Sequence, residues 1–374
     1  MNLNQGCTAS EASRTFSHKE KSLHSQGKPG IGGLISVLNL VYQRRMQMEQ
    51  RVLGIDVAKD TLDVALSDGV RLNYGQFSNT QKGHEELERW LRKHSAQSIH
   101  VCLEATGQYG DGVSEYLFTQ GFSVSVVNPA RIKHYANSKL RRNKTDKADA
   151  QLIAEYCIRE NPAIWTPPPA SFKELQTLVR HLDDLQGAFQ QESNRLQSGV
   201  HTAFVVNSLS SICNFLEEQI KQTKKAIQEH IDQHEELKRM QDLIVTIPGI
   251  GKLTAAKLLG EIRNILDFQS ARQLAAYAGL TPRNFLSGTS VHKKTRLSKT
   301  GNANLRKSLY MPAIVSIKCN PVIHSFCERL TRSGLLPMEV IGAAMRKLLH
   351  LVYGVLKTGR PFDPNYLASL QVPS

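Results

Sequence analysis

The sequence of 374 residues predicts an α/β domain, a helical arm and a mostly α-helical C-terminal domain, in that order. Strand-like and helix-like segments alternate in the first half, which is typical of an α/β sheet. Helical repeats follow a proline-rich segment, and helical patterns occupy most of the remainder. A chain of this length suits two or three domains. We expect a disordered extension over residues 1–48, the α/β domain over 49–160, a linker and the arm over 161–240, and the C-terminal domain over 241–374.

Five short segments of the α/β domain have the composition of β-strands. They are residues 52–58, 61–67, 70–77, 99–104 and 123–127. The pair Asp68-Gly69 separates the second from the third and favours a hairpin turn. Helices are expected at residues 80–94, where Thr80 is the N-cap, and around 113–119. Three antiparallel strands followed by alternating helix and strand describe an α/β sheet of the RNase H type.

Longer helical patterns begin at residue 144. A helix over residues 144–160 precedes a linker, residues 161–170, that contains four prolines. Apolar residues then recur at heptad spacing over residues 175–196, and a second apolar pattern runs over 209–231. These repeats predict a helical hairpin or coiled-coil arm, although the core of an ordinary bundle explains so few heptads equally well.

A glycine-containing turn precedes another expected helix, residues 252–262. The turn is Ile247-Pro248-Gly249-Ile250-Gly251, and Gly249 and Gly251 would leave backbone N–H groups at the positive end of that helix. It resembles a helix-hairpin-helix element, which holds a phosphate backbone without reading sequence. A dinucleotide-binding loop fits less well, because the preceding segment is helical and a third glycine at the right spacing is missing. Further helices are expected at residues 302–317 and 338–356.

Positive charge exceeds negative charge and is concentrated in one region. The sequence has 47 Lys and Arg against 33 Asp and Glu, a formal net charge of +14, which favours nucleic acid as a partner. Residues 268–327 contain no acidic residue. The basic residues there that we expect to contact nucleic acid are Arg283, Lys293, Lys294, Arg296, Lys299 and Arg306. The alternative is a basic surface paired with acids from elsewhere in the fold.

The cysteine pattern and the apolar runs bear on location. Six cysteines lie far apart without a Cys-x-x-Cys pair, so neither a zinc site nor a disulfide framework is expected, and a reducing cytoplasm is the predicted location. No apolar run reaches membrane-spanning length, so no membrane is expected as a partner.

Four carboxylates carry the expected chemistry. Asp56 lies in an apolar strand, where an ionised carboxylate needs a metal ion or a cationic partner. Glu104 ends another strand, a position at which open α/β sheets carry ligand sites. Asp146 and Asp149 are three residues apart and share one face of a helix. Together the four could hold one or two Mg²⁺ ions, which prefer oxygen ligands and serve phosphoryl transfer.

Neighbouring residues support or compete with these four acids. Arg141, Arg142 and Lys144 precede Asp146 and would contact the phosphates of a nucleic acid. Asp60 and Asp63 are rival acids near Asp56, but we expect them to be solvated in a turn and in the second strand.

The acid-free span also contains candidate nucleophiles. Ser287 lies in the stretch Phe285-Leu286-Ser287-Gly288-Thr289-Ser290, and a serine beside bound metal ions could take a broken DNA end onto itself. Spacing alone does not choose among the hydroxyl groups of this span, and it does not exclude Tyr310. A serine in such a span is most often a loop residue or a phosphate contact.

Motifs in both halves of the chain resemble one known family. In the first half they are Gly54-Ile55-Asp56-Val57-Ala58-Lys59, Glu104-Ala105-Thr106-Gly107, Asn128-Pro129-Ala130 and Asn143-Lys144-Thr145-Asp146-Lys147-Ala148-Asp149-Ala150. In the second half they are Ile247-Pro248-Gly249-Ile250-Gly251, Tyr277-Ala278-Gly279-Leu280-Thr281-Pro282, Ser287-Gly288-Thr289-Ser290, Lys299-Thr300-Gly301-Asn302 and Leu309-Tyr310-Met311-Pro312-Ala313. The chain resembles the DEDD transposases, the bridge-RNA-guided insertion-sequence recombinases related to the Piv DNA invertases. The resemblance covers about residues 50–362, and the motifs are specific in combination.

The resemblance implies a RuvC-like catalytic domain and a transposase domain that carries the catalytic serine. It implies that Asp56, Glu104, Asp146 and Asp149 are the four acids of the family and that Ser287 is the nucleophile. It further implies an oligomer, a dimer or tetramer, in which the acids of one subunit meet the serine of another. A bridge RNA from the element's flank would specify target and donor DNA.

We therefore expect a transposase that cuts, exchanges and rejoins DNA strands through a Mg²⁺-assisted phosphoserine intermediate. The first alternative is a metal-dependent nuclease or junction resolvase, which would use the same acids with water as nucleophile. The second is a nucleic-acid-binding protein without catalysis, which leaves the four-acid set unexplained.

Overall fold

The computed structural model describes residues 51–68, 71–94, 99–105, 107–139, 145–199, 202–287 and 291–365. The expected extension over residues 1–48 lies outside these ranges. The chain divides into two compact units, of which the first ends at Pro167 and the second begins at Pro168. The four-part division expected from the sequence stays a prediction, and the two units are described separately below.

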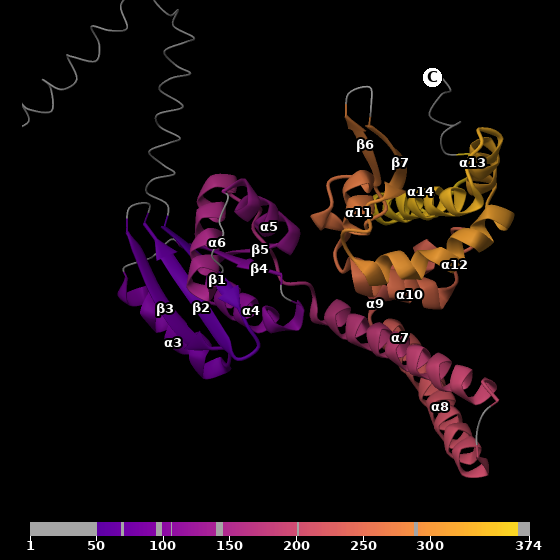
Figure 1. Ribbon diagram of the computed structural model, residues 1–374, viewed down its shortest axis with the longest axis horizontal. Coiled ribbons are helices and arrows are strands. Elements are labelled where there is room, and N and C mark those ends of the chain that lie inside the picture. Colours follow the sequence, from indigo (N-terminus) through magenta and orange to yellow (C-terminus); the bar gives the residue numbers. More distant parts are fainter. Residues whose placement is uncertain are drawn as a thin grey trace, which may run out of the picture. The chain divides into compact units, whose positions relative to one another are not determined.

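A five-stranded mixed sheet forms the centre of the first unit (Figure 1). Its strands are β1 (Arg51–Val57), β2 (Thr61–Ser67), β3 (Leu72–Ser78), β4 (Ile99–Glu104) and β5 (Ser123–Val127). The strand order is β3-β2-β1-β4-β5. The pairs β1–β2 and β2–β3 are antiparallel, whereas β1–β4 and β4–β5 are parallel. All five predicted strands are present, and their order and directions describe a sheet of the RNase H type.

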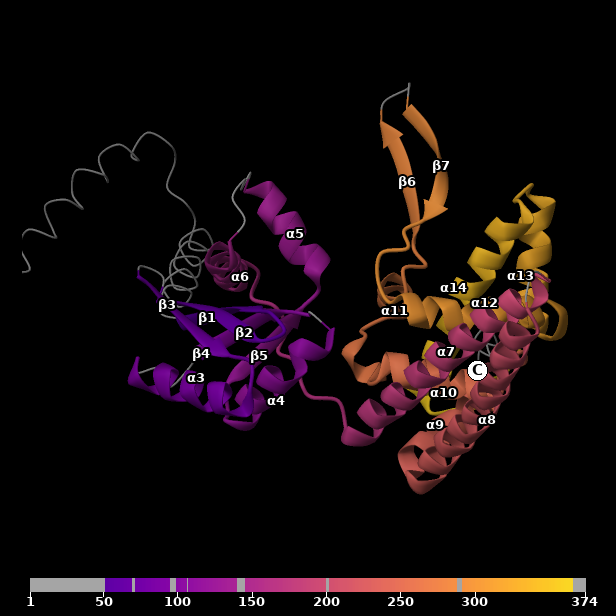
Figure 2. The same cartoon turned by 60° about the horizontal axis from the view of Figure 1, so that its bottom comes forward.

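Helices cover both faces of this sheet (Figure 2). They are α3 (Gln81–Lys93), α4 (Asp111–Thr119), α5 (Pro129–Ser138) and α6 (Asp146–Glu160), and a short 3₁₀ helix, η1 (Gly107–Tyr109), follows β4. Leu53 and Ile55 of β1 point to the face covered by α3 and α4, whereas Val52 belongs to the core beneath α5 and α6. Because side chains alternate along a strand, Gly54 and Asp56 share the α6 face with Val52.

Gly54 sets the distance between β1 and α6. A Cβ atom at this position would lie 2.2 Å from the carbonyl oxygen of Ala150 and 2.4 Å from the backbone nitrogen of Ala154. Only glycine permits this approach, since any side chain would push the helix away from the sheet. The expected capping of α3 is present too, because the Thr80 hydroxyl accepts a hydrogen bond from the backbone N–H of Gly83.

The second unit is mainly helical, as the sequence predicts. Two long helices, α7 (Ala170–Gln197) and α8 (Ala203–Gln233), form a hairpin, which matches the predicted arm; its coiled-coil character stays a prediction. The other helices are α9 (Glu235–Val245), α10 (Lys252–Ile262), α11 (Ala271–Tyr277), α12 (Ala303–Cys319), α13 (Pro321–Arg332) and α14 (Pro337–Thr358), with a 3₁₀ turn η2 (Ile265–Asp267). Their core includes Leu182, Ile231, Leu259, Leu309 and Leu348, which are at most 1% exposed.

A two-stranded hairpin in the second unit was not expected from the sequence. Strands β6 (Pro282–Ser287) and β7 (Val291–Leu297) pair antiparallel, with an irregularity between Arg283 and Phe285 (Figure 2). The sequence of β7, Val-His-Lys-Lys-Thr-Arg-Leu, lacks a clear alternation of apolar and polar residues. The intervening turn also lacks the Asn-Gly or Asp-Gly pair that marks short hairpins. Within the described ranges, no helix combines the length and apolar composition needed to cross a lipid bilayer.

Candidate active site

Two of the predicted acids lie on neighbouring parallel strands of the first unit. Asp56 is the sixth residue of β1, and Glu104 is the last residue of β4. The register pairs Ile55 with Leu103, so the two acids follow at equivalent positions in the two strands. Cys102, two residues before Glu104, packs in the core beneath α6. Strand alternation therefore places both acids on the α6 face of the sheet.

The other two acids come from the first turn of α6. Thr145 is the N-cap of this helix, and its hydroxyl accepts a hydrogen bond of 3.2 Å from the backbone N–H of Ala148. Asp146 and Asp149 follow immediately, as the sequence predicts. The N-terminus of a helix carries partial positive charge, which favours carboxylates there. The close contact of α6 with Gly54 holds this turn near the end of β1.

Electrostatics show that the four acids act on one another. Burial raises the pKa of Asp56, and repulsion from Asp149, Asp146, Glu104 and Asp63 adds to it, so that the pKa of Asp56 rises to about 6. In the described part of the chain, no three His, Cys, Asp or Glu side chains are already gathered as ligands around one point. The donor set nevertheless suits Mg²⁺, because all four groups are hard oxygen donors and a divalent cation would relieve their mutual repulsion.

A fifth acid, Asp63, lies closer to this group than the sequence suggested. It pairs directly opposite Asp56 across β1 and β2, and Gln76 lies opposite it on β3. The side-chain amide of Gln76 donates to both carboxylate oxygens of Asp63, at 3.1 and 3.2 Å. Asp63 is therefore held by a neutral partner that leaves its negative charge uncompensated, and this charge contributes to the raised pKa of Asp56.

Asn79 connects the two loops that follow the acid-bearing strands. Its amide nitrogen donates to the carbonyl oxygens of Ala58, at 3.0 Å, and of Tyr109, at 2.9 Å. Its side-chain oxygen must then accept from Nε2 of His84, at 3.0 Å. This assignment leaves Nδ1 of His84 unprotonated, which agrees with burial lowering the pKa of that imidazole. No sequence pattern indicates this connection, because Asn79 donates to backbone atoms of distant segments.

The raised pKa of Asp56 predicts how the stability of the metal-free protein depends on pH. A carboxylate whose pKa is about 6 in the folded state and 3.8 when unfolded holds its proton longer in the folded state. The free energy of unfolding should therefore fall as pH rises from about 4 to 6, by on the order of 1 to 2 kcal/mol after allowance for solvent screening. Urea unfolding in EDTA measures this fall, and the difference between wild type and Asp56→Asn isolates the contribution of Asp56. A difference that stays constant across this pH range would contradict the prediction.

The predicted serine lies in the second unit, at the end of β6. Ser287 pairs with Val291 across the hairpin, while its side chain, residues 288–290 and the side chains of Lys293 and Lys294 lie outside what the structure describes. Arg141, Arg142 and Lys144 also lie outside it. Arg283, Arg296 and Lys299 are exposed. How the acids and Ser287 meet stays a prediction.

Other hydroxyl groups and cations of the acid-free span have contacts of their own. The Ser298 hydroxyl accepts from the backbone N–H of Thr300 at 3.2 Å, and Tyr310 is 38% exposed on α12. Nη1 of Arg306 donates to the carbonyl oxygen of Ala278 at 2.9 Å, so this residue also has a structural task that the sequence did not indicate.

Backbone hydrogen bonds fix the base of the β6–β7 hairpin. The N–H groups of Ser298, Lys299 and Asn302 donate to the carbonyl oxygens of Thr281, Gly279 and Tyr277, at 2.9, 3.1 and 2.7 Å. Gly301 has a φ of +129°, and a Cβ atom there would lie 2.2 Å from the Tyr277 oxygen. Strand β6, which ends in Ser287, therefore starts from a tightly constrained base.

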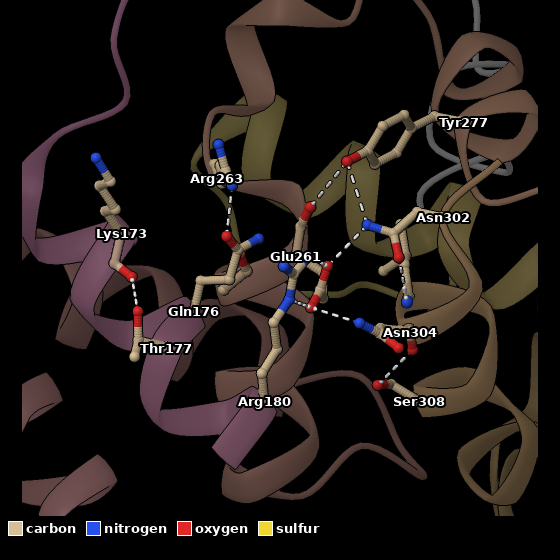
Figure 3. Close-up of polar contacts among 12 residues, drawn as sticks. Lys173, Gln176, Thr177, Arg180, Glu261, Arg263, Tyr277, Asn302, Asn304 and Ser308 are labelled. Atoms are coloured by element: carbon tan, nitrogen blue, oxygen red, sulfur yellow. Dashed lines mark hydrogen bonds and ion pairs between the residues drawn. The ribbon is translucent and has the colours of Figure 1, made fainter. Parts of the chain in front are cut away.

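Glu261 connects the base of the β6–β7 hairpin to α7 through hydrogen bonds (Figure 3). The side chain of Glu261 is 2% exposed and receives two hydrogen bonds from Arg180 of α7, at 2.8 and 3.0 Å. Asn302, the N-cap of α12, donates to the same carboxylate at 2.8 Å, and Asn304 donates at 3.4 Å. Burial raises the pKa of Glu261, but the hydrogen bonds from Arg180 and Asn302 outweigh it, so the pKa lies below its usual range. No motif or spacing in the sequence marks Glu261, although it is one of the last acids before the acid-free span.

Glu261→Ala should destabilise the protein by about 3 kcal/mol, because Arg180 and Asn302 would lose the acceptor that they share. The measurement is urea unfolding of the full chain. Glu328→Ala is the matched control, since Glu328 is 50% exposed and pairs with Arg332 on the surface of α13. The control should cost less than about 1 kcal/mol. Equal losses in the free energy of unfolding would show that the hydrogen bonds of Glu261 stabilise the fold no more than a surface ion pair does.

The glycine turn before α10 packs against α12. Gly249 has a φ of +100°, and a Cβ atom there would lie 2.1 Å from Oγ of Ser316. Ser316 and Asn320 both donate to the carbonyl oxygen of Pro248, at 3.0 and 3.3 Å. Close packing against Ser316 therefore accounts for the glycine at position 249, and no bound phosphate is needed to explain it. Gly251 is the exposed N-cap of α10, and the predicted phosphate contact there stays a prediction.

Comparisons with known proteins agree with the motifs. A family model for DEDD transposases of the IS110 type, described as "Transposase", matches residues 53–205. A second, described as "Transposase IS116/IS110/IS902 family", matches residues 241–328. A solved structure titled "T. thermophilus RuvC in complex with Holliday junction substrate" aligns with 31% of this chain and 98% of that chain, at 16% identity and a TM-score of 0.25. The strand order β3-β2-β1-β4-β5, and not that alignment, identifies the sheet as one of the RNase H type.

Two curated relatives cover most of the chain. The "Pilin gene-inverting protein" of Moraxella bovis is 35% identical over 319 residues, which is 84% of this chain and 98% of the relative. The "Transposase for insertion sequence element IS1111A" of Coxiella burnetii is 25% identical over 303 residues, which is 71% of this chain and 78% of the relative. The chain therefore belongs to the IS110 family of DEDD transposases and is a homologue of the pilin gene-inverting proteins.

Proposed function

We propose that this protein is the DNA recombinase of an insertion sequence, which cuts, exchanges and rejoins DNA strands. In this proposal Asp56, Glu104, Asp146 and Asp149 hold one or two Mg²⁺ ions, and Ser287 is the nucleophile. The observation that carries the proposal is the placement of the acids, with Asp56 and Glu104 at equivalent positions of two parallel strands and Asp146 and Asp149 in the first turn of α6. The raised pKa of Asp56, to which the other three acids contribute, agrees with this placement. Mutually repelling carboxylates at one edge of a sheet are a costly arrangement that binding of a divalent cation explains.

The four acids would have one task, to bind Mg²⁺ through oxygen atoms. Bound Mg²⁺ would polarise the scissile phosphate and compensate the charge that develops on it. Asp56 and Glu104 are fixed by two hydrogen-bonded strands, and Asp146 and Asp149 by a capped helix turn. Asp63 and its partner Gln76 would support the site by keeping a further negative charge beside Asp56.

Ser287 would attack the phosphorus atom of one DNA strand. A bond forms between its oxygen and phosphorus, and one bridging P–O bond of the strand breaks. The serine loses its proton, and the departing deoxyribose oxygen gains one. The phosphoserine ester conserves the energy of the broken bond, so that a second strand can reverse the reaction and be joined without ATP. Two observations support this role, the fixed base of the hairpin and the absence of acids from residues 268–327.

The proposed partners are DNA, a bridge RNA and further copies of this chain. The excess of positive charge supports both nucleic acids, while RNA guidance rests on the resemblance to the family. Apolar side chains on α8 support an oligomer, a dimer or tetramer, joined through the arm. Phe204, Ile212 and Phe215 are 81%, 42% and 62% exposed there, an arrangement typical of surfaces that pack against another chain.

Hydrolysis is the second candidate function. Two of the four acids lie on a sheet of the RNase H type and two on a helix that packs against it, and metal-bound acids alone suffice for a nuclease that uses water as its nucleophile. Such an enzyme would leave free DNA ends. A binding protein without catalysis would need neither Mg²⁺ nor the four acids.

A search for a covalent protein–DNA product separates these functions. The full-length protein is incubated with end-labelled DNA carrying the element's ends, its RNA and Mg²⁺, and the reaction is stopped with SDS. A recombinase that uses Ser287 should yield a labelled band that shifts to the size of the protein and disappears after proteolysis. Mass spectrometry should assign the nucleotide adduct to Ser287. Free cleaved ends without an adduct would indicate hydrolysis, and uncleaved DNA would indicate a binding protein.

A further inference from the structure

A wide groove opens in the second unit beside the base of the β6–β7 hairpin. It has a volume of about 1280 Å³ and is lined by residues of α11, α13, α14 and the end of β7. Pockets for small molecules usually measure roughly 300–1,000 Å³. The groove is therefore large enough for a segment of a polymer, and the functions proposed above leave it without a role.

Apolar side chains form the floor of this groove. Leu280, Leu297, Phe326 and Leu335 line it, and Leu336 and Met338 are 54% and 64% exposed beside them. Large apolar side chains grouped at a surface lower the free energy when a partner covers them. A double-stranded nucleic acid presents mainly phosphate and sugar to a protein surface, so it would leave this floor uncovered.

Cations surround the apolar floor. Arg272, Arg296, Lys299, Arg346 and Lys347 line the groove. Among the residues that the structure describes, none of these five pairs with a carboxylate. The one acid of the lining, Glu339, accepts a hydrogen bond of 2.9 Å from the backbone N–H of Leu336 at the start of α14.

Two further side chains of the lining are aromatic. Nε2 of His350 is buried and has no hydrogen-bond partner among the residues that the structure describes. Two cations lie over the ring of Phe326, with Nζ of Lys347 at 6.0 Å and Cζ of Arg329 at 5.6 Å from its centroid. Aromatic side chains in a cation-lined groove are the groups with which proteins bind unpaired bases and their phosphates.

We propose that this groove binds an unpaired strand of nucleic acid, with bases over the floor and phosphates on the cations. Charge complementarity and the apolar floor together favour this occupant over a duplex, which needs only the cations. Arg296 belongs to β7 and Lys299 to the fixed base of the hairpin, so a bound strand would continue toward the hairpin that ends in Ser287. The biological use of the strand rests on the recombinase function proposed above, but its binding does not.

The test measures binding by the full-length protein in EDTA, where no cleavage chemistry takes place. Fluorescence anisotropy is followed for labelled single-stranded DNA and RNA of one sequence, for the DNA duplex, and for an abasic strand with the same phosphates. The apolar floor is tested by Met338→Glu against Met311→Glu, because both methionines are exposed, at 64% and 62%, and only Met338 lines the groove. The cations are tested by Arg346→Ala against Arg332→Ala, since Arg332 is exposed outside the groove.

Met338→Glu and Arg346→Ala should weaken single-strand binding at least about fivefold, while both controls bind as wild type. The abasic strand should bind wild type less tightly than the natural strand, and Met338→Glu should remove that difference. Photocrosslinking through 4-thiouridine in RNA or 4-thiothymidine in DNA should mark peptides containing Phe326 or Met338, and its relative yield shows which strand the groove prefers.

Wild-type affinity for the single strand in both groove variants would overturn the proposal, and so would equal affinity of wild type for natural and abasic strands. A third contrary result is that an acidic amphipathic peptide displaces the strand while the strand crosslinks only to peptides outside the groove. The search for a covalent adduct in Mg²⁺ does not depend on these outcomes. Failure of the groove to bind a strand can therefore be distinguished from failure of the proposed recombinase function.

Discussion

Asp56→Asn will abolish strand cleavage and joining, lowering the rate by at least about 10³-fold, the scale seen when a group central to transition-state stabilisation is lost. Asparagine keeps the shape of the side chain but removes the negative charge that a bound Mg²⁺ needs. The measurement is recombination between two element ends on a plasmid in Mg²⁺, with products counted after a fixed time. Asp60→Asn is the matched control, since it makes the same change at an exposed turn four residues away.

The thermal stability of Asp56→Asn tests the proposed metal site independently of recombination. Without metal, Asp56→Asn should unfold at a higher temperature than wild type at neutral pH, because a repelled, partly buried charge has been removed. Adding Mg²⁺ should raise the unfolding temperature of wild type much more than that of the variant. Wild-type recombination by Asp56→Asn, or an equal response to Mg²⁺, would rule out Asp56 as a metal ligand.

The fold of the first unit could be predicted because its signals are local. Short runs of strand-forming residues mark each strand, and the spacing of Asp146 and Asp149 places them on the same face of a helix. The convergence of the acids follows from strand order, since β1 and β4 are parallel neighbours. Their electrostatic coupling could be expected only once Gly54 was seen to bring α6 onto the sheet.

The missed features depend on contacts between distant segments. Glu261 appears in the sequence as the one acid of a mostly apolar helix, and its role depends on Arg180 and Asn302, which lie 81 and 41 residues away. Asn79 acts on backbone carbonyls, which leave no trace in sequence patterns. The β6–β7 hairpin is rich in cations, and β7 lacks apolar alternation, so its sequence carries no clear strand signal.

Ser287→Ala will remove the covalent adduct and strand joining, with a loss of at least about 10³-fold, because no other atom of that side chain can form the phosphoester. Binding of DNA and RNA should stay within about twofold of wild type, since a single neutral hydroxyl contributes little to polyanion binding. Ser290→Ala is the control, because it removes a hydroxyl from the same segment. An adduct that persists in Ser287→Ala and vanishes in Ser290→Ala would move the nucleophile to Ser290.

Mixing the two inactive variants tests whether the acids and the serine come from different subunits. Asp56→Asn retains Ser287, and Ser287→Ala retains all four acids, so a mixed dimer contains one composite site with a complete set of groups. If the acids of one copy serve the serine of another, mixing should restore activity, to about a quarter of the wild-type rate for randomly mixed dimers whose two sites work independently. The adduct should then form only on the Asp56→Asn chain, which can be given a different mass by a tag. If acids and serine of a single copy work together, no mixture can complete a site, and activity will stay at the level of the separate variants.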